Sequence, residues 1–87
     1  MQADSYLIGQ TLDLSMVGAR ILLHRALPVD ASVQMDLAAG EIVLELRARV
    51  IRVNRVGEDR YEIGLQFTFV EADTARQLRQ FIEEFER

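Results

Sequence analysis

Apolar and polar residues alternate along most of the chain, and a period of two is typical of half-buried β-strands. The first predicted strand runs from Tyr6 to Leu14, with Ile8, Leu12 and Leu14 on its inward face. Four further strands with the same alternation are predicted over residues 19–24, 33–37, 41–54 and 61–67. Pro28 interrupts the pattern between the second and third strands. Because the other links are short, we expect an antiparallel sheet that curls into a small barrel.

The longest predicted strand, Glu41 to Asn54, changes its inward face part of the way along. Its apolar residues lie on one face as far as Val50, and the pattern then shifts by one residue to Ile51 and Val53. A shift of one residue predicts a β-bulge, and bulges help a sheet to curl. Before this strand, Gly40 marks a hairpin turn.

The period changes near the end of the chain, where it becomes that of a helix. Spacings of three and four residues separate the apolar positions Leu78, Phe81, Ile82 and Phe85. Thr74 and Gln77 fit a capping box at the start of this helix. We expect the apolar stripe to cover an open end or edge of the barrel. The predicted fold class is therefore mainly β: a small antiparallel β-barrel with one C-terminal α-helix, in a single domain over residues 1–87.

Aromatic side chains are expected in the core rather than on a base-stacking surface. They occupy the inward positions of the last strand and of the helix, at Tyr61, Phe67, Phe69, Phe81 and Phe85. Basic residues do not accompany them in the way that single-stranded nucleic-acid binders require. The aromatic pattern therefore indicates packing.

The composition supports a small globular domain and excludes several kinds of chemistry. Of the 87 residues, 49% are hydrophobic and 28% are charged, and none is cysteine. Disulfides, thiolate catalysis and cysteine zinc sites are therefore excluded. The sequence has no apolar run long enough to cross a membrane and no signal peptide at its N-terminus. We expect a cytoplasmic domain, or the cytoplasmic part of a larger protein, without direct membrane insertion.

All ten basic residues are arginine, although the net charge is −4. The acidic total argues against DNA or RNA as a partner, because nucleic-acid binding usually requires a basic surface. Arginine nevertheless suits phosphates and guanine edges, so a local anion site is compatible with this charge. Arg47, Arg49, Arg52 and Arg55 on the long strand are either such a site or a solvated face that alternates with acidic residues.

The stretch DLSMVG, residues 13–18, is the first candidate for a functional site. Asp13 and Ser15 project from the face opposite Leu14, and Gly18 suits a tight turn. Either these residues only build the turn, or they form half of a ligand site. A catalytic Ser-His-Asp set would need His24 between them, and nothing in the sequence orients it there. We predict neither catalytic residues nor a metal site, and therefore no enzyme.

Three segments in order resemble the PilZ domain family. They are TLDLSMVGARI at 11–21, ARVIRVN at 48–54, and YEIGLQF at 61–67, which the predicted helix follows. The first segment contains the D/N-x-S-x-x-G signature of the family. The resemblance implies a six-stranded barrel, of which five strands are visible here, and a role as a non-enzymatic receptor for the bacterial second messenger cyclic di-GMP.

The resemblance also implies the residues that contact the ligand. Asp13, Ser15 and Gly18 would contact a guanine, and Arg20 would lie close to the ligand. Carboxylate and hydroxyl groups suit the N1 and N2 donors of guanine, and glycine permits close approach. No cofactor other than this ligand is expected, and the partner would be a protein or an attached domain that responds to binding.

One part of the family pattern is missing from this sequence. Members that bind the nucleotide carry an R-x-x-x-R motif upstream of the signature, and no such motif occurs in this chain. Each charged hydrogen bond of this kind contributes about 1.5–3 kcal/mol. Losing two would weaken binding by roughly two to four powers of ten. The first barrel strand is expected to be missing with the motif.

Two interpretations follow from the missing motif. Either the chain is part of a longer protein, or it is a degenerate PilZ domain that acts as a protein–protein interaction adaptor. A homodimer formed through the barrel edge that the missing strand leaves open is a further option.

Overall fold

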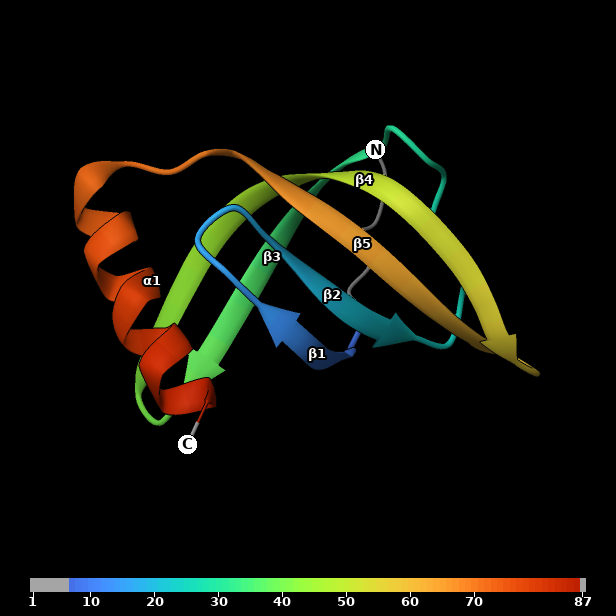
Figure 1. Cartoon of the computed structure of the whole chain (residues 1–87), viewed down its shortest axis with the longest axis horizontal. Coiled ribbons are helices and arrows are strands. Elements are labelled where there is room, and N and C mark those ends of the chain that lie inside the picture. Colours follow the sequence, from blue (N-terminus) through green and yellow to red (C-terminus); the bar gives the residue numbers. More distant parts are fainter. Residues whose placement is uncertain (1–6, 87) are drawn as a thin grey trace, which may run out of the picture.

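Five antiparallel strands and one helix make up the chain in the computed structural model, which describes residues 7–86 (Figure 1). The elements are β1 (Gln10–Leu14), β2 (Gly18–Leu23), β3 (Ser32–Ala39), β4 (Ile42–Gly57), β5 (Arg60–Phe69) and α1 (Ala72–Phe85). The strands form one sheet in the order β1-β2-β5-β4-β3, with β1 and β3 at its edges. The predicted fold class is confirmed: the sheet curls into a half-barrel, and the helix packs at one end of it.

The core lies on the concave face of the sheet and takes the inward residues of every strand. Val50, Ile63 and Leu78 are the largest side chains that are completely buried. In the register, Leu65 of β5 pairs with Ala19 of β2 on one side and with Val50 of β4 on the other. Burying a side chain of this size stabilises the fold by about 1.5–3 kcal/mol. The predicted inward faces of β2, β3 and β5 are thereby confirmed, except at Phe69.

β-Bulges occur on three of the strands and account for the curl. The predicted shift on β4 is confirmed, because Val50 pairs with Leu65 whereas Arg52 pairs with Gly64. The extra residue, Ile51, was expected to face inward, but it faces outward and is 51% exposed. Two residues of a bulged strand share one partner, so the extra residue leaves the alternation.

Two aromatic residues expected in the core are exposed instead. Phe69 is 73% exposed because a bulge at Thr68 moves it onto the outer face, opposite Arg47. Phe85 is 43% exposed at the last turn of α1. Phe67 is buried as predicted.

The first strand is shorter than the sequence predicts. It begins at Gln10, which pairs with Leu22 near the end of β2, and the described residues before it, 7–9, are not in a strand. Ile8 precedes the strand and is 90% exposed, which contradicts its predicted inward position. Tyr6, the predicted first residue of the strand, lies outside the described residues.

The helix begins earlier than the predicted capping box. Its N-cap is Glu71, whose side chain makes no capping hydrogen bond. The carbonyl of Glu71 accepts the first helical hydrogen bond, from the amide of Ala75 at 2.7 Å. Thr74 therefore lies inside the first turn, and the predicted capping box with Gln77 is wrong. Within residues 7–86, the structure has no helix that is both long and apolar enough to span a membrane.

The connections follow the glycine and proline signals of the sequence. Gly40 adopts a positive φ of 61° in the two-residue turn between β3 and β4, as that turn requires. Pro28 lies in the link between β2 and β3, outside the strands. This link is attached to β4 by two backbone hydrogen bonds, from Asp30 to Val50 and from Val50 to Ala31.

Candidate functional site

The signature stretch forms the turn between β1 and β2, and the side chain of Ser15 holds it together. The Ser15 hydroxyl accepts hydrogen bonds from the amides of Val17 and Gly18, both at 3.2 Å. It also donates to the carbonyl of Gly18 at 3.2 Å. A serine hydroxyl offers one donor and two acceptor positions, and all three are used here. Ser15 therefore organises the turn in this structure.

Gly18 lies where the turn meets the centre of the sheet. A Cβ built on Gly18 would be only 2.2 Å from the carbonyl oxygen of Leu65, a distance that no side chain tolerates. The amide of Phe67 donates to the carbonyl of Val17 at 2.8 Å and fixes the turn on β5. The glycine of the signature is therefore required because two backbone segments come this close.

Four residues of the outer face form a row that crosses four strands. Asp13 of β1 pairs with Arg20 of β2, and Arg20 pairs with Gly64 of β5. On its other side, Gly64 pairs with Arg52 of β4. Neighbouring strands lie about 4.8 Å apart, which places the backbones of the two arginines about 10 Å apart. Because glycine has no side chain, the row has a gap between its arginines.

Two carboxylates bind Arg20 from either side. Its guanidinium lies 3.1 Å from Glu62 and 3.8 Å from Asp13. The side chains of Arg20 and Asp13 are 40% and 69% exposed, whereas that of Glu62 is 25% exposed. Exposed ion pairs are weak, so the shorter and more buried contact with Glu62 is the stronger of the two. In the described part of the chain, Arg52 makes no ion pair.

The row and the turn together enclose an open hollow of about 240 Å³. Its lining combines side chains with exposed backbone: Asp13, Leu14, Ser15, Gly18, Ala19, Arg20, Ile51, Arg52, Gly64 and Leu65. Arginine forks, a carboxylate and a flat glycine floor can together bind a planar polar group that carries donors and negative charge.

The structure brings together all four residues named from the sequence: Asp13, Ser15, Gly18 and Arg20. Sequence reasoning did not connect the signature with Arg52 and Gly64, although both lie in segments that carry the resemblance. Two features of the sequence point to Arg52 and Gly64: the bulge predicted next to Arg52 and the single glycine within the last strand. A bulge often redirects side chains at a functional site, and a lone glycine in a regular strand often marks a close approach.

The other candidates lie apart from this hollow. Arg47 and Arg49 are exposed and do not line it, whereas Arg52 does, so the arginines of β4 do not act as one continuous surface. Arg55 donates to the carbonyl of Gly57 at 3.2 Å. His24 follows the far end of β2 and contacts the carbonyl of Asp59 at 3.2 Å. The described residues contain no group of three or more histidine and acidic side chains placed to hold a metal ion.

Comparison with known proteins identifies the family. A family model described as PilZ domain matches residues 1–84. No curated protein and no solved structure matches the chain. The match covers the signature turn, the bulged strand and the glycine of β5, which are the segments that enclose the hollow. The chain therefore belongs to the PilZ domain family, which is known for binding and regulatory domains that act as cyclic di-GMP receptors.

Proposed function

We propose that this domain is a cyclic di-GMP receptor and that the hollow between the β1–β2 turn and the bulge of β4 binds one guanine of the ligand. The observation that carries the proposal is the row formed by Asp13, Arg20, Gly64 and Arg52. The role would be regulatory and cytoplasmic, with a partner protein or an attached domain responding to the bound state.

The chemistry of the row suits a guanine base. The flat base would lie over Gly64, where the outer face lacks a side chain. Asp13 would accept hydrogen bonds from the N1 and N2 donors, as an exposed carboxylate is able to do. The planar guanidinium groups of Arg20 and Arg52 would stack on the base or bind a phosphate.

The volume of the hollow limits what it binds by itself. Pockets for small ligands usually measure about 300–1,000 Å³. At about 240 Å³, the hollow has room for a single base. The phosphates and the second base would need contacts from elsewhere, and the printed sequence contains no R-x-x-x-R motif. We therefore expect weak binding by these residues alone and tighter binding when such a segment is attached upstream.

Arg20 gives the site a regulatory element of its own. Before the ligand binds, Arg20 contacts both Asp13 and Glu62. The contact with Arg20 uses one oxygen of Asp13, and a bound guanine would compete for that oxygen. Ligand binding would therefore exchange the contact between Asp13 and Arg20 for contacts with the base and a phosphate, and Glu62 would compete with the phosphate for the arginine.

Calorimetric titration with cyclic di-GMP tests the proposal. Both the chain itself and a version with an R-x-x-x-R segment attached upstream should be titrated. Asp13→Ala should lower the affinity of the extended version about 10- to 100-fold, because it removes a charged hydrogen bond that contributes about 1.5–3 kcal/mol. Arg52→Ala should also weaken binding, whereas Arg49→Ala is the matched control because this arginine of the same strand does not line the hollow. The receptor function is rejected if the extended version releases no heat at tens of micromolar ligand.

A second candidate function is a protein-interaction adaptor of the same fold that binds no nucleotide. It is favoured by Ser15, whose hydroxyl is used completely within the turn. It is also favoured by Arg20, whose charge is already compensated by two carboxylates. Under this alternative, the protein does not bind cyclic di-GMP with or without the substitution. Asp13→Ala would then change only partner binding or stability.

A further inference from the structure

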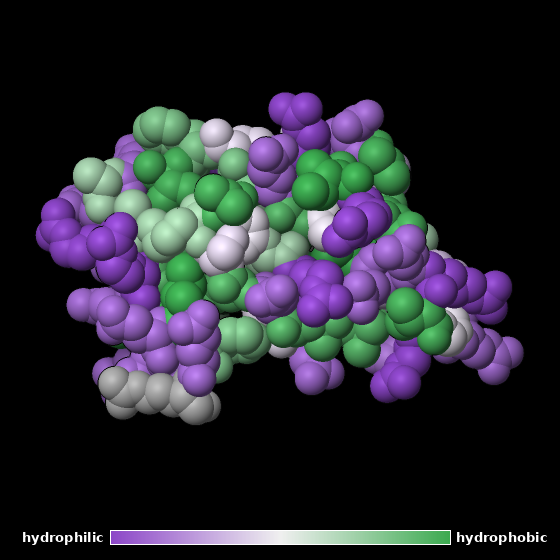
Figure 2. All heavy atoms as spheres, in the orientation of Figure 1, coloured by the Kyte–Doolittle hydropathy of each residue, from purple (hydrophilic) through white to green (hydrophobic). Residues whose placement is uncertain are grey.

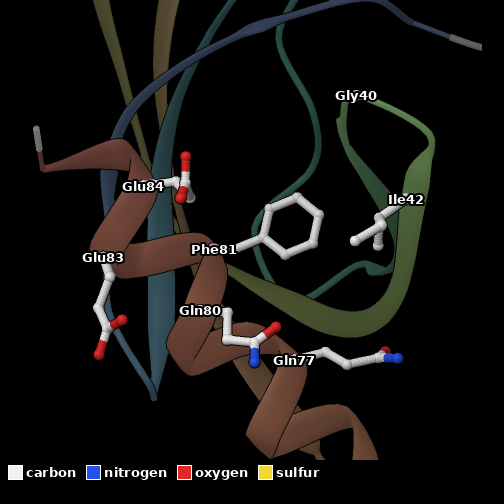
Figure 3. A pocket seen from close by; sticks show the side chains of 7 residues that line it. All are labelled: Gly40, Ile42, Gln77, Gln80, Phe81, Glu83 and Glu84. Carbon is white, nitrogen blue, oxygen red and sulfur yellow. The ribbon is translucent and has the colours of Figure 1, made fainter.

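A second hollow lies between α1 and the tip of the β3–β4 hairpin (Figure 3). Its volume is about 440 Å³, and it shares no lining residue with the hollow at the signature turn. The lining residues are Gly40, Ile42, Gln77, Gln80, Phe81, Glu83 and Glu84. We call this feature the helix groove.

The floor of the helix groove is apolar and incompletely covered. The ring of Phe81 points from α1 toward the hairpin, where Ile42 lies on the opposite wall (Figure 3). Ile42 is 51% exposed although it belongs to the inward series of β4. Along the apolar stripe of the helix, Leu78 is completely buried and Phe85, two turns later, is 43% exposed. The helix is therefore packed at its middle and open toward its end.

The rim of the helix groove is negatively charged at a helix terminus that favours positive charge. Glu83 and Glu84 line the groove, Glu86 follows the helix, and no basic residue lies in the last turn. Carbonyl groups at a C-terminus carry partial negative charge, which these glutamates reinforce. Hydrophilic side chains gather over this end of the helix in the space-filling view (Figure 2). A cation at the groove would relieve repulsion from both sources.

The ion pairs between described residues do not neutralise this rim. Among the described residues, the only ion pair of the helix joins Arg76 and Asp73 in its first half, at 3.3 Å. Glu83 and Glu84 take part in none within that part of the chain. At the signature hollow, by contrast, Arg20 compensates two carboxylates. The helix groove thus combines an exposed apolar floor with negative charge that no ion pair among residues 7–86 neutralises.

We infer that the helix groove is a docking site for a segment of a partner protein that carries an apolar side chain flanked by lysine or arginine. The apolar side chain would fill the space between Phe81 and Ile42, and the basic residues would meet Glu83, Glu84 and the helix C-terminus. Nucleic acid and anionic membrane surfaces would be repelled by the same glutamates. This surface does not depend on nucleotide binding at the signature hollow.

A second copy of the chain is the competing occupant. Its outer face offers Phe69 of β5, which is exposed and pairs with Arg47 of β4. Such a contact would join two different surfaces, and contacts of this type form open chains unless the rotation closes a ring. A segment of a separate partner protein would fill the groove without linking copies of the domain into open chains.

Titration of the uniformly ¹⁵N-labelled protein with a synthetic amphipathic peptide of leucine and lysine tests the inference. Saturable shifts should occur at the amides of Ile42, Gln77 and Glu84, and the amides of Gly18 and Gly64 should stay unchanged. A peptide with glutamate in place of lysine should not bind. The double variant Glu83→Gln/Glu84→Gln should weaken binding about tenfold, because two charges on the rim are lost. Glu71→Gln, at the opposite end of the helix, is the matched control.

Three results would overturn the inference: no saturable shift at millimolar peptide, shifts elsewhere on the surface, or equal affinity in the double variant and its control. Ile42→Ser gives an independent test, because this exposed side chain contributes little to the core, and it should reduce peptide affinity while the protein stays folded. Light scattering after gel filtration detects the competing occupant. Self-association that Arg47→Glu and Ile42→Ser both abolish would assign the groove to a second copy instead.

Discussion

The signature hollow and the helix groove differ in how their walls are built. Backbone forms much of the signature hollow, where a turn approaches β5 so closely that Gly18 has no room for a Cβ. Its charges are arranged in opposing pairs around Arg20. The helix groove lies between side chains of α1 and a hairpin, and its charges are of one sign. Only Leu78 of the helix is completely buried in the core.

This difference separates two kinds of recognition. A site built from closely packed backbone has a fixed shape and suits a rigid, planar ligand, because little ordering is needed on binding. A groove between a helix and a hairpin tip is more easily adjusted and suits side chains of a partner.

Leu78→Ala should have the largest effect on stability. Removing a completely buried leucine costs about 2–5 kcal/mol, since a cavity remains where its side chain packed. Denaturation by urea measures the change in the free energy of unfolding. Phe85→Ala on the same stripe is the matched control and should cost less than about 1 kcal/mol, because that side chain is already 43% exposed. Equal losses would mean that the end of the helix is packed as firmly as its middle.

Gly18→Ala should destabilise the protein by about 1–3 kcal/mol, because the new Cβ would overlap the carbonyl of Leu65. Gly64→Ala is a direct comparison within the same hollow. Its Cβ would come no nearer than 3.4 Å, to the Cβ of Arg52, which is an ordinary contact. We expect Gly64→Ala to retain stability and to weaken cyclic di-GMP binding by reducing the space over the floor. Thermal unfolding and calorimetry distinguish the two glycines, and a stable Gly18→Ala protein would refute the close approach.

Glu62→Gln should lower the free energy of unfolding by less than about 1 kcal/mol, as expected for an ion pair that is partly exposed to solvent. Its effect on ligand binding should be opposite in sign. Without Glu62, Arg20 is freer to reach a phosphate, so the affinity for cyclic di-GMP should rise about threefold. A fall in affinity would show instead that Glu62 orients Arg20 for binding.

Glu71→Asp should give the smallest change, a gain of about 0.5 kcal/mol, because aspartate is a better N-cap than glutamate and keeps the charge. Thr74→Ala should be nearly neutral, since Thr74 lies inside the first turn. The groove lies toward the other end of the helix, so peptide affinity should not change in either variant. Chemical denaturation measures both. A large loss from Thr74→Ala would restore the capping role that the sequence predicts.

Much of the fold is predictable because alternation records which face of a strand is buried. Ala19 and Leu23 of β2 are buried as their spacing requires, and so are the alternate residues of β4, Leu44, Leu46, Ala48 and Val50. The bulge on β4 is also visible in the pattern, because two apolar residues, Val50 and Ile51, adjoin. Alternation predicts the wrong face for Phe69. The bulge at Thr68 leaves no mark in the sequence, because the residues around it all favour strands.

The candidate site is only half visible in the sequence. The signature places Asp13, Ser15 and Gly18 within six residues, so a local pattern identifies them. Arg52 and Gly64 join them through pairing between strands distant in the sequence, and register is set by the whole sheet. Compensation of Arg20 by Glu62 is likewise a product of tertiary structure, because 42 positions separate the two residues.

The strand order has a consequence for how the protein folds. The hairpins β3–β4 and β4–β5 close over short turns, but β2 must find β5 across the two intervening strands of the sequence. Pairings over such separations carry a larger entropic cost of loop closure and slow folding. The row from Asp13 to Arg52 exists only after β2 has joined β5. A ligand bound at the row would therefore slow unfolding by holding together the most non-local pairing in the sheet.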